Sequence, residues 1–451
     1  MKEKKIDFHW SKSYWVLTIY AMILLNAVWS LWLLRFSESF NTNDSRGPHR
    51  MENVRNGGIG VTSNSKNVFE GKSIGYAISI TSCPTNASNM ITIDGPAILS
   101  HSIHQIHSHL NYSAPSKYRN YSLYAIIHPD AERCTKHLVR FGFQLLLRSV
   151  PVNVTNITSP RYRYLIELDG CCGSREFLKL WSFTLVQHDI VVHLDVDGFL
   201  QRPLDIIFDT MLRENSSYLA LDTHDSFLEP RFRSHTGFRE LSRIDFAYTR
   251  DYNQQSKITT DPQRYGVQGG FFVLRPSWKT FDEMSKLLHL GNYTLNKGWG
   301  KSYYGGYYGS PQIQGFLSYY FTALYPQSAI ELNRCYHNAM LDNPYDISGR
   351  CKTGQESCQD CREVTLSEMF FVHLTLCWKP WQCPSLNAPK AVRCRDVHRA
   401  WFQLRKSYEE SLGYSDAVIE TAFHPNVTLG YCQRRNQGIP KPIYRPMKIV
   451  K

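Results

Sequence analysis

The sequence predicts an α/β fold, in which a largely parallel β-sheet follows an N-terminal transmembrane helix. Apolar runs of strand length alternate with stretches of helical periodicity from residue 73 onward, an alternation typical of parallel α/β sheets. Before them, residues 14–34 contain no charged side chain. At about 1.5 Å per residue they are long enough to cross a hydrocarbon core. The two observations divide the chain into a membrane anchor and a globular part.

The anchor and its flanks predict a single-pass type II membrane protein. The tail at residues 1–13 carries four lysines, which favour a cytosolic location, and Tyr14 and Trp32 lie near the ends of the span. A cleaved signal peptide is the alternative, but the apolar stretch is long and no small-x-small cleavage site follows it. Residues 35–72 are poor in apolar side chains and predict a flexible stem.

Two further patterns predict that everything after the anchor lies in the lumen of the Golgi or endoplasmic reticulum. All twelve cysteines lie beyond residue 80, where a secretory lumen would oxidise them to disulfides. Nine Asn-x-Ser/Thr sequons also follow the anchor: Asn43, Asn86, Asn111, Asn120, Asn153, Asn156, Asn215, Asn292 and Asn426. The net charge of +12 suits an anionic partner, which can be nucleic acid, an anionic membrane surface or a phosphorylated small molecule. In this compartment nucleic acid is not expected.

The globular elements follow in order. We expect strands at residues 76–81, 121–128, 190–194, 271–274 and 367–376, and helices at residues 97–110 and 176–187. The first helix holds His101, His104, His107 and His109, but no cysteine or carboxylate accompanies them. A half-exposed helix face is therefore favoured over a metal cluster. Together these elements predict one catalytic domain at residues 73–420, followed by a C-terminal tail at 421–451.

Two other segments leave alternatives open. Residues 299–310 (WGKSYYGGYYGS) are rich in glycine and tyrosine and predict either a mobile loop that stacks on a sugar or a disordered surface loop. Cys351, Cys358 and Cys361 have the spacing C-x₆-C-x₂-C, which fits a zinc knuckle but in a lumen favours disulfides. The adjacent Cys171 and Cys172 cannot easily bridge each other, so each is expected to pair elsewhere.

Two carboxylates follow the apolar run at residues 190–194. Side chains two residues apart in an extended chain share a side, so Asp195 and Asp197 point the same way. In open α/β sheets, ligands bind beyond the carboxyl ends of the strands. Two oxygen ligands at such a position can hold Mg²⁺ or Mn²⁺, and the cation would in turn bind a diphosphate.

Four blocks carry a resemblance to a known family. Residues 193–209 (HLDVDGFLQRPLDIIFD), 179–181 (KLW), 269–277 (GGFFVLRPS) and 373–381 (HLTLCWKPW) resemble, in the same order, blocks of the family 8 glycosyltransferases, the glycogenin and galactinol synthase group. The resemblance covers residues 74–385. It implies a GT-A fold, in which a Rossmann-like half binds a nucleotide-diphospho-sugar and a second half binds the acceptor.

The resemblance also assigns roles to individual residues. It implies that His373 is the third metal ligand beside Asp195 and Asp197, and that Lys379 pairs with the diphosphate. Gln314 is the best-placed group for the reacting face, and Asp222 matches an acidic position near the donor sugar. The implied donor-binding set is Ile80, Thr81, Ser82, Lys179, Asp195, Val196, Asp197, Gln268, Gly269, His373 and Lys379.

Three positions depart from the family pattern. The aspartate expected before Gln314 is replaced by Ile313, the asparagine before the Gly block by Gln268, and a glycine after the histidine by Leu376. The first change removes a carboxylate from the reacting face.

The sequence therefore predicts a retaining glycosyltransferase. It would move a hexose or related sugar from a UDP-sugar to an unidentified glycan, protein or lipid acceptor, with Mn²⁺ or Mg²⁺. One alternative is a non-catalytic, membrane-anchored protein of the same fold that binds a sugar or nucleotide. The other is a metal-dependent phosphohydrolase that uses the same aspartate pair.

Overall fold

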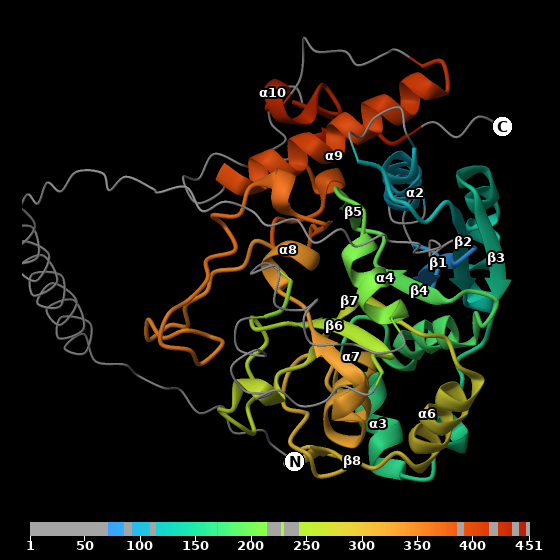
Figure 1. Cartoon of the computed structure of the whole chain (residues 1–451), viewed down its shortest axis with the longest axis vertical. Helices are drawn as coiled ribbons and strands as arrows, with labels where there is room; N and C mark the ends of the chain where they lie inside the picture. Colours follow the sequence, from blue (N-terminus) through green and yellow to red (C-terminus); the bar gives the residue numbers. More distant parts are fainter. Residues whose placement is uncertain are drawn as a thin grey trace, which may run out of the picture. The chain divides into compact units, whose positions relative to one another are not determined.

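The computed structural model describes residues 71–84, 93–108, 114–168, 170–213, 227–229, 243–385, 392–414, 423–434 and 442–447 (Figure 1). The predicted tail, anchor and most of the stem lie outside these residues, as does Asp222. Within the described ranges, no helix combines the length and apolarity that crossing a bilayer requires.

A mixed sheet forms the centre of the fold, with the strand order β10-β6-β7-β4-β1-β2-β3. Its seven strands are β1 (Ser73–Ile80), β2 (Asn120–Ile127), β3 (Phe143–Leu147), β4 (Ile190–Leu194), β6 (Phe246–Arg250), β7 (Val267–Leu274) and β10 (Ala329–Glu331). β7 pairs antiparallel with both β4 and β6, and the other pairs are parallel. The predicted Rossmann-like, largely parallel α/β sheet is confirmed. The C-terminal ends of β4 and β6 and the N-terminal end of β7 therefore share one edge.

The sheet is buried on both faces because its strands alternate between two apolar cores. On β4, Ile190, Val192 and Leu194 belong to the core beneath α2 (Asp94–His107). Val191 belongs to the opposite core. A strand covered on both sides reads as a continuous apolar run, which is why this strand was recognisable in the sequence.

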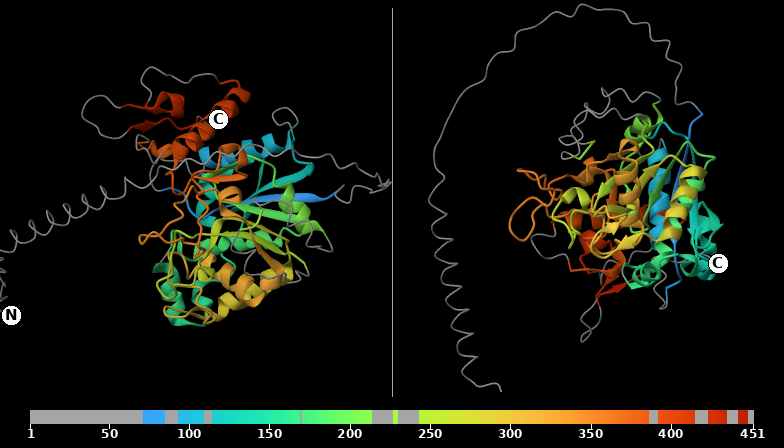
Figure 2. Two further views of the ribbon diagram at one scale, coloured as in Figure 1. Left: turned by 60° about the vertical axis from the view of Figure 1, so that its left-hand side comes forward. Right: turned by 90° about the horizontal axis from the view of Figure 1, so that it is seen from below.

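Helices cover both faces of the sheet. α2 lies beside α9 (Val392–Ser411), and α10 (Pro425–Thr428) packs on α9 at the same end of the described unit (Figure 1 and Figure 2). The other α-helices of the described residues are α3 (Pro160–Leu168), α4 (Asp205–Leu212), α6 (Trp278–Leu290), α7 (Ile313–Ser318) and α8 (Arg334–His337). The helix predicted at 176–187 is a 3₁₀ helix, η5 (Gly173–Thr184). It packs with α6 and α7 in the second core.

Further 3₁₀ turns span Pro129–Cys134, Lys136–Phe141, Val154–Asn156, Pro262–Arg264, Pro326–Ser328, Leu366–Glu368 and Pro380–Gln382, and a π-helical turn spans Tyr319–Leu324. Three two-stranded ribbons complete the fold. They are β5 (Gly198–Leu200) with β11 (Phe371–His373), β8 (Tyr293–Thr294) with β9 (Gly298–Trp299), and β12 (Cys432–Gln433) with β13 (Ile443–Tyr444).

Five disulfides connect ten of the twelve cysteines: Cys83–Cys134, Cys335–Cys361, Cys351–Cys358, Cys377–Cys394 and Cys383–Cys432. The prediction of disulfides is confirmed and the zinc knuckle is wrong, because all three cysteines of the C-x₆-C-x₂-C spacing are oxidised. The expectation that Cys171 and Cys172 pair elsewhere is also wrong, since no other cysteine is left to accept them. Five disulfides indicate an oxidising secretory compartment.

The glycine- and tyrosine-rich segment at 299–310 is packed against the protein. Trp299, Tyr304 and Tyr307 are buried, and the indole N–H of Trp299 donates to the carbonyl of Ser310 at 2.9 Å. The interpretation as a disordered surface loop is therefore wrong. Tyr308 remains exposed.

The histidines of α2 serve the packing of the helix. The His107 Nε2 lies 3.1 Å from the Tyr76 hydroxyl, and the His104 Nδ1 lies 2.8 Å from the Tyr121 hydroxyl. These partners support the helix-face interpretation. His109 lies outside the described residues.

The described parts of the segment at 421–451 pack on the domain rather than leaving it. The Asp94 carboxylate, at the start of α2, lies 3.3 Å from the Arg405 guanidinium on α9, and both side chains are almost fully buried. The Tyr444 hydroxyl and the Met447 backbone N–H donate to the same carboxylate at 3.0 and 2.9 Å. One buried ion pair thus joins α2, α9 and the C-terminal segment.

We predict that Arg405→Met destabilises the fold by about 3–5 kcal/mol, because it leaves the buried Asp94 carboxylate without its cation. Lys406→Met is the control, since Lys406 and its partner Glu410 are half exposed, and it should cost about 0.5 kcal/mol or less. Urea unfolding followed by circular dichroism, with disulfides intact, measures both. Equal losses would contradict a specific role for the buried pair.

Candidate functional site

The predicted aspartates lie where the central sheet meets the β5–β11 ribbon. The backbone N–H of Asp195, directly after β4, donates to the carbonyl of Gly270 on β7 at 2.8 Å. The chain then turns into β5, and the carbonyl of Asp197 accepts a hydrogen bond from Leu374 at 3.0 Å. Both carboxylates are thus held by backbone contacts at the edge where ligands bind in α/β sheets.

The pairing of β5 with β11 brings a distant histidine to the aspartates. Its register places His373 opposite Gly198, the residue after Asp197. The His373 Nε2 lies 3.3 Å from the Asp197 Oδ1. One ligand atom from each of Asp195, Asp197 and His373 lies within 4.8 Å of the other two. The structure therefore brings together the three residues that the sequence predicts as metal ligands.

Two lysines compensate the carboxylates. The Lys179 ammonium, on η5, lies 2.9 Å from the Asp195 Oδ1 and donates to the carbonyl of Gly269 at 3.0 Å. The Lys379 ammonium is paired with the Asp197 Oδ2. Both lysines predicted to contact the donor thus lie within one hydrogen bond of the metal-ligand candidates.

These contacts determine the ionisation state of the site. Burial alone would raise the pKa of the Asp197 carboxyl, but His373 and then Lys379 hold that pKa well below its usual range. Burial alone would lower the pKa of Lys179, but Asp195 and then Glu176 raise it above its ordinary value. Asp197 is therefore ionised and Lys179 protonated around neutral pH.

Asn338 orients the imidazole, and sequence reasoning missed it. Its amide nitrogen donates to the Thr249 hydroxyl at 2.9 Å and the Gln268 Oε1 at 3.2 Å, so its oxygen faces the His373 Nδ1 at 3.1 Å. Asn338 therefore holds the ring through Nδ1, so that Nε2 faces Asp197. Asn338 follows α8, and no pattern in the sequence around it marks this role.

Gln268, predicted to contact the donor, is held by contacts within the protein. Its side-chain oxygen accepts from the Gly270 backbone N–H at 2.6 Å and from Asn338. It supports the histidine and β7 within the protein, and its contact with a donor stays a prediction.

The residues present fit a small, hard divalent cation. Two carboxylates and one imidazole are ligands typical of Mn²⁺, and the imidazole directs its Nε2 towards Asp197. Gly270 leaves room beside them: a Cβ at this position would lie 2.5 Å from the His373 Cε1 and 2.6 Å from the Asp195 Oδ2. A larger residue here would displace two of the three ligands.

Gln314 lies on α7, next to the same strand. A Cβ at Gly269 would lie 3.3 Å from the Gln314 Cγ and 3.2 Å from the Ile313 Cγ2. The Gln314 Oε1 is buried without a hydrogen-bond partner in the described part of the chain. Ile313 is fully buried in the second core. A carboxylate at this position would be buried as well. The isoleucine that replaces the expected aspartate therefore contributes to the apolar core.

The segment predicted to bind the nucleoside lies at the end of β1. Ile80 is buried, Thr81 is half buried and Ser82 is exposed. The Thr81 carbonyl accepts from the Arg175 guanidinium at 3.2 Å. Val196 is half buried between the two aspartates. Asp222 lies outside the described residues, so its role stays a prediction.

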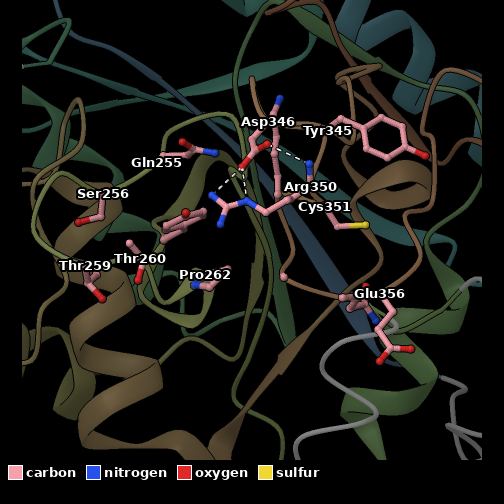
Figure 3. A pocket seen from close by; sticks show the side chains of 15 residues that line it. Gln255, Ser256, Thr259, Thr260, Pro262, Tyr345, Asp346, Arg350, Cys351 and Glu356 are labelled. Carbon is pink, nitrogen blue, oxygen red and sulfur yellow. Dashed lines mark hydrogen bonds and ion pairs between the residues drawn. The ribbon is translucent and has the colours of Figure 1, made fainter.

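Two adjoining cavities, each of about 730 Å³, open beyond the C-terminal end of β6. Figure 3 shows the first, where the Arg350 guanidinium reaches the Asp346 carboxylate at 3.2 Å and Tyr345 stands at the wall. The second cavity shares Tyr345 and is also lined by Tyr308. Sequence reasoning missed both, because their walls come from loops far apart in the chain.

Comparison with known proteins finds no matching family model and no matching curated protein. Among solved structures, the chain is similar to the bifunctional glycosyltransferase WbbM in its apo form, at 12% identity and a TM-score of 0.37, over 76% of this chain and 51% of that one. It is similar to mouse xyloside xylosyltransferase 1 at 10% identity and a TM-score of 0.36, over 67% and 98%. It is similar to the galactosyltransferase LgtC at 12% identity and a TM-score of 0.38, over 72% and 94%. This chain thus spans about half of WbbM, and at such low scores the functional proposal rests on its own residues.

We predict that Gly270→Ala lowers the affinity for Mn²⁺ by about 10–100-fold, because the added methyl group displaces His373 and Asp195. Gly269→Ala is the control on the same strand, since its methyl group would meet Ile313 and Gln314 instead. Titration calorimetry with Mn²⁺ measures both variants, and equal affinities would argue against this ligand set.

Proposed function

We propose that this protein is a metal-dependent, retaining glycosyltransferase of the GT-A fold. It transfers a hexose or related sugar from a UDP-sugar to an acceptor in the Golgi or endoplasmic-reticulum lumen, and residues 14–34 anchor it in the membrane. One observation carries the proposal: two carboxylates and an imidazole converge between two lysines at the carboxyl end of β4. Such a group suits a cation bridged to a diphosphate.

The charges of the chain suit a leaving diphosphate. Asp195, Asp197 and His373 would hold Mn²⁺ or Mg²⁺, which supplies Lewis-acid stabilisation of negative charge. The Lys379 ammonium pairs with a metal-ligand candidate and can turn to a phosphate oxygen as negative charge develops on it. Lys179 holds Asp195 in place from the side of η5.

Gln314 is proposed to face the reacting sugar. Its oxygen has no internal partner in the described residues, and its Cγ lies next to Gly269, one residue from Gly270 at the metal-ligand candidates. A sugar hydroxyl bound there would supply the hydrogen bond that this oxygen lacks.

A non-catalytic sugar- or nucleotide-binding protein is the second candidate. The observation in its favour is Ile313, which places a buried apolar side chain where the family has a carboxylate. This candidate predicts donor binding without turnover. The phosphohydrolase alternative predicts release of inorganic phosphate and gives no role to Lys379.

We infer that the acceptor is a saccharide bound in the second cavity. Exposed tyrosines such as Tyr308 and Tyr345 suit stacking on sugar rings, and the mixed charges of Lys352 and Asp346 suit a neutral ligand. The residue after Tyr308 lies near the site, because a Cβ at Gly309 would lie 3.2 Å from the Gln314 Nε2.

The first prediction from this proposal concerns the metal ligands. Asp197→Asn and His373→Ala should each lower Mn²⁺-dependent UDP-sugar hydrolysis by more than about 100-fold and leave the folded circular dichroism spectrum intact. Asp282→Asn, an exposed position on α6, is the control. A screen of common UDP-sugars by product analysis first identifies the donor. Normal turnover in either ligand variant would refute the assignment.

The second prediction concerns the leaving group. Lys379→Ala should lower kcat by about 10²–10³-fold, because the departing diphosphate loses a positive charge, and should change KM for the donor less. Lys379→Arg should recover part of the loss, since it restores the charge. Steady-state kinetics separate the two parameters. A purely structural lysine would give a destabilised protein with an unchanged kcat for the folded fraction.

The third prediction concerns the acceptor. Tyr308→Ala should raise KM for a saccharide acceptor by about 3–10-fold through lost stacking, while UDP-sugar hydrolysis in its absence stays unchanged. Tyr303→Ala is the matched control, because Tyr303 is exposed on the same segment without lining either cavity. Initial rates of transfer to aryl glycosides measure the effect. Equal KM values in the two variants would place the acceptor elsewhere.

A further inference from the structure

Two cysteines remain thiols in a chain whose other ten form disulfides. Cys171 and Cys172 are adjacent and lead directly into η5, the helix that carries Lys179. Cys171 is exposed and Cys172 is half buried. In an oxidising compartment, an accessible pair of thiols without a cysteine partner needs another form of stabilisation.

A carboxylate completes a three-ligand cluster with the thiols. The Glu176 Oε1 accepts a hydrogen bond from the Cys171 Sγ at 2.9 Å. The two sulfur atoms and this carboxylate provide ligand atoms that all lie within 4.8 Å of one another. Only 13% of the Glu176 side chain is exposed, whereas Cys171 faces solvent, so the cluster has a fixed base and an open entry.

We propose that Cys171, Cys172 and Glu176 bind a soft divalent cation of the Zn²⁺ class. Thiolates select such cations over Mn²⁺ and Mg²⁺, which prefer the oxygen and imidazole ligands of the other site. Two sulfur atoms and one oxygen make three corners of a tetrahedron, and water from the exposed side of Cys171 supplies the fourth. The chain thus separates two metals by ligand chemistry.

The exchange is balanced in charge. The cation displaces one proton from each thiol and releases both to solvent, with no change of oxidation state. The two thiols and the Glu176 carboxylate carry a charge of −1 before binding, and the two thiolates, the carboxylate and the cation carry −1 afterwards. Lys179 therefore faces the same net charge in both states.

The geometry lets the cation and Lys179 share Glu176. The Oε1 faces Cys171, while the Oε2 lies 3.3 Å from the Lys179 ammonium, which is itself 2.9 Å from the Asp195 Oδ1. A cation bound at Oε1 fixes the start of η5 and leaves the pairs of Lys179 in place. The site thus positions Lys179 against the carboxylate at the end of β4.

The test uses the full-length chain, purified in detergent without reductant so that the five disulfides stay intact. Mass spectrometry after alkylation should find two alkylated thiols in the metal-free protein. In the presence of Zn²⁺, both thiols should be protected from alkylation. Cd²⁺ should produce the ultraviolet thiolate-to-metal charge-transfer band with one equivalent per chain. Calorimetry with Zn²⁺ should show one thiol-dependent site with release of protons.

Three variants make the outcome decisive. Cys171→Ser with Cys172→Ser should abolish the Cd²⁺ band, and Glu176→Gln, which keeps both thiols, should weaken Zn²⁺ binding by about 10-fold or more. Asp197→Asn should keep the Cd²⁺ band, which separates this site from the one at β4.

Two outcomes would overturn the proposal. The first is a native mass two units lower with no alkylated thiols, which would show a disulfide between Cys171 and Cys172. A Cd²⁺ charge-transfer band of undiminished size in the double cysteine variant would also overturn the proposal. None of these readouts depends on glycosyl transfer.

Discussion

The compensation of two carboxylates at the end of β4 is the interaction on which the site depends. Asp195 and Asp197 follow a fully buried strand, where an unpaired charge would cost several kcal/mol. Lys179 faces the first, and His373 and Lys379 face the second. Each of these partners comes from a different element. Three features therefore bring side chains to the two aspartates. They are the packing of η5, the pairing of β5 with β11, and the loop after β11.

The arrangement explains why an antiparallel strand lies in an otherwise parallel sheet. β7 brings its N-terminal end, with two glycines, to the edge where β4 ends. Gly270 accepts the hydrogen bond from Asp195 and leaves space for His373, while the carbonyl of Gly269 binds Lys179. A parallel strand at this position would bring its C-terminal end here instead. The mixed topology thus provides a backbone surface on which the charged groups converge.

The sequence contained enough information for the local features and for the expectation that two aspartates and a distant histidine lie together. The strand at 190–194 was predicted with its observed bounds because a doubly buried strand is a continuous apolar run. The convergence of Asp195, Asp197 and His373 agreed with the resemblance to a known family. Asn338 was missed, because a single amide in a loop has no periodicity or spacing to mark it. The fate of Cys171 and Cys172 was also missed, since disulfide connectivity depends on distances that a sequence does not contain.

Two disulfides enclose the segment that carries Lys379. Cys377–Cys394 ties one side of it to α9, and Cys383–Cys432 ties the other side to β12. Because Cys432 lies 49 residues after Cys383, the second bond can close only once the intervening chain has entered the oxidising compartment. The segment with Lys379 therefore becomes fixed only after both α9 and β12 have followed it into that compartment.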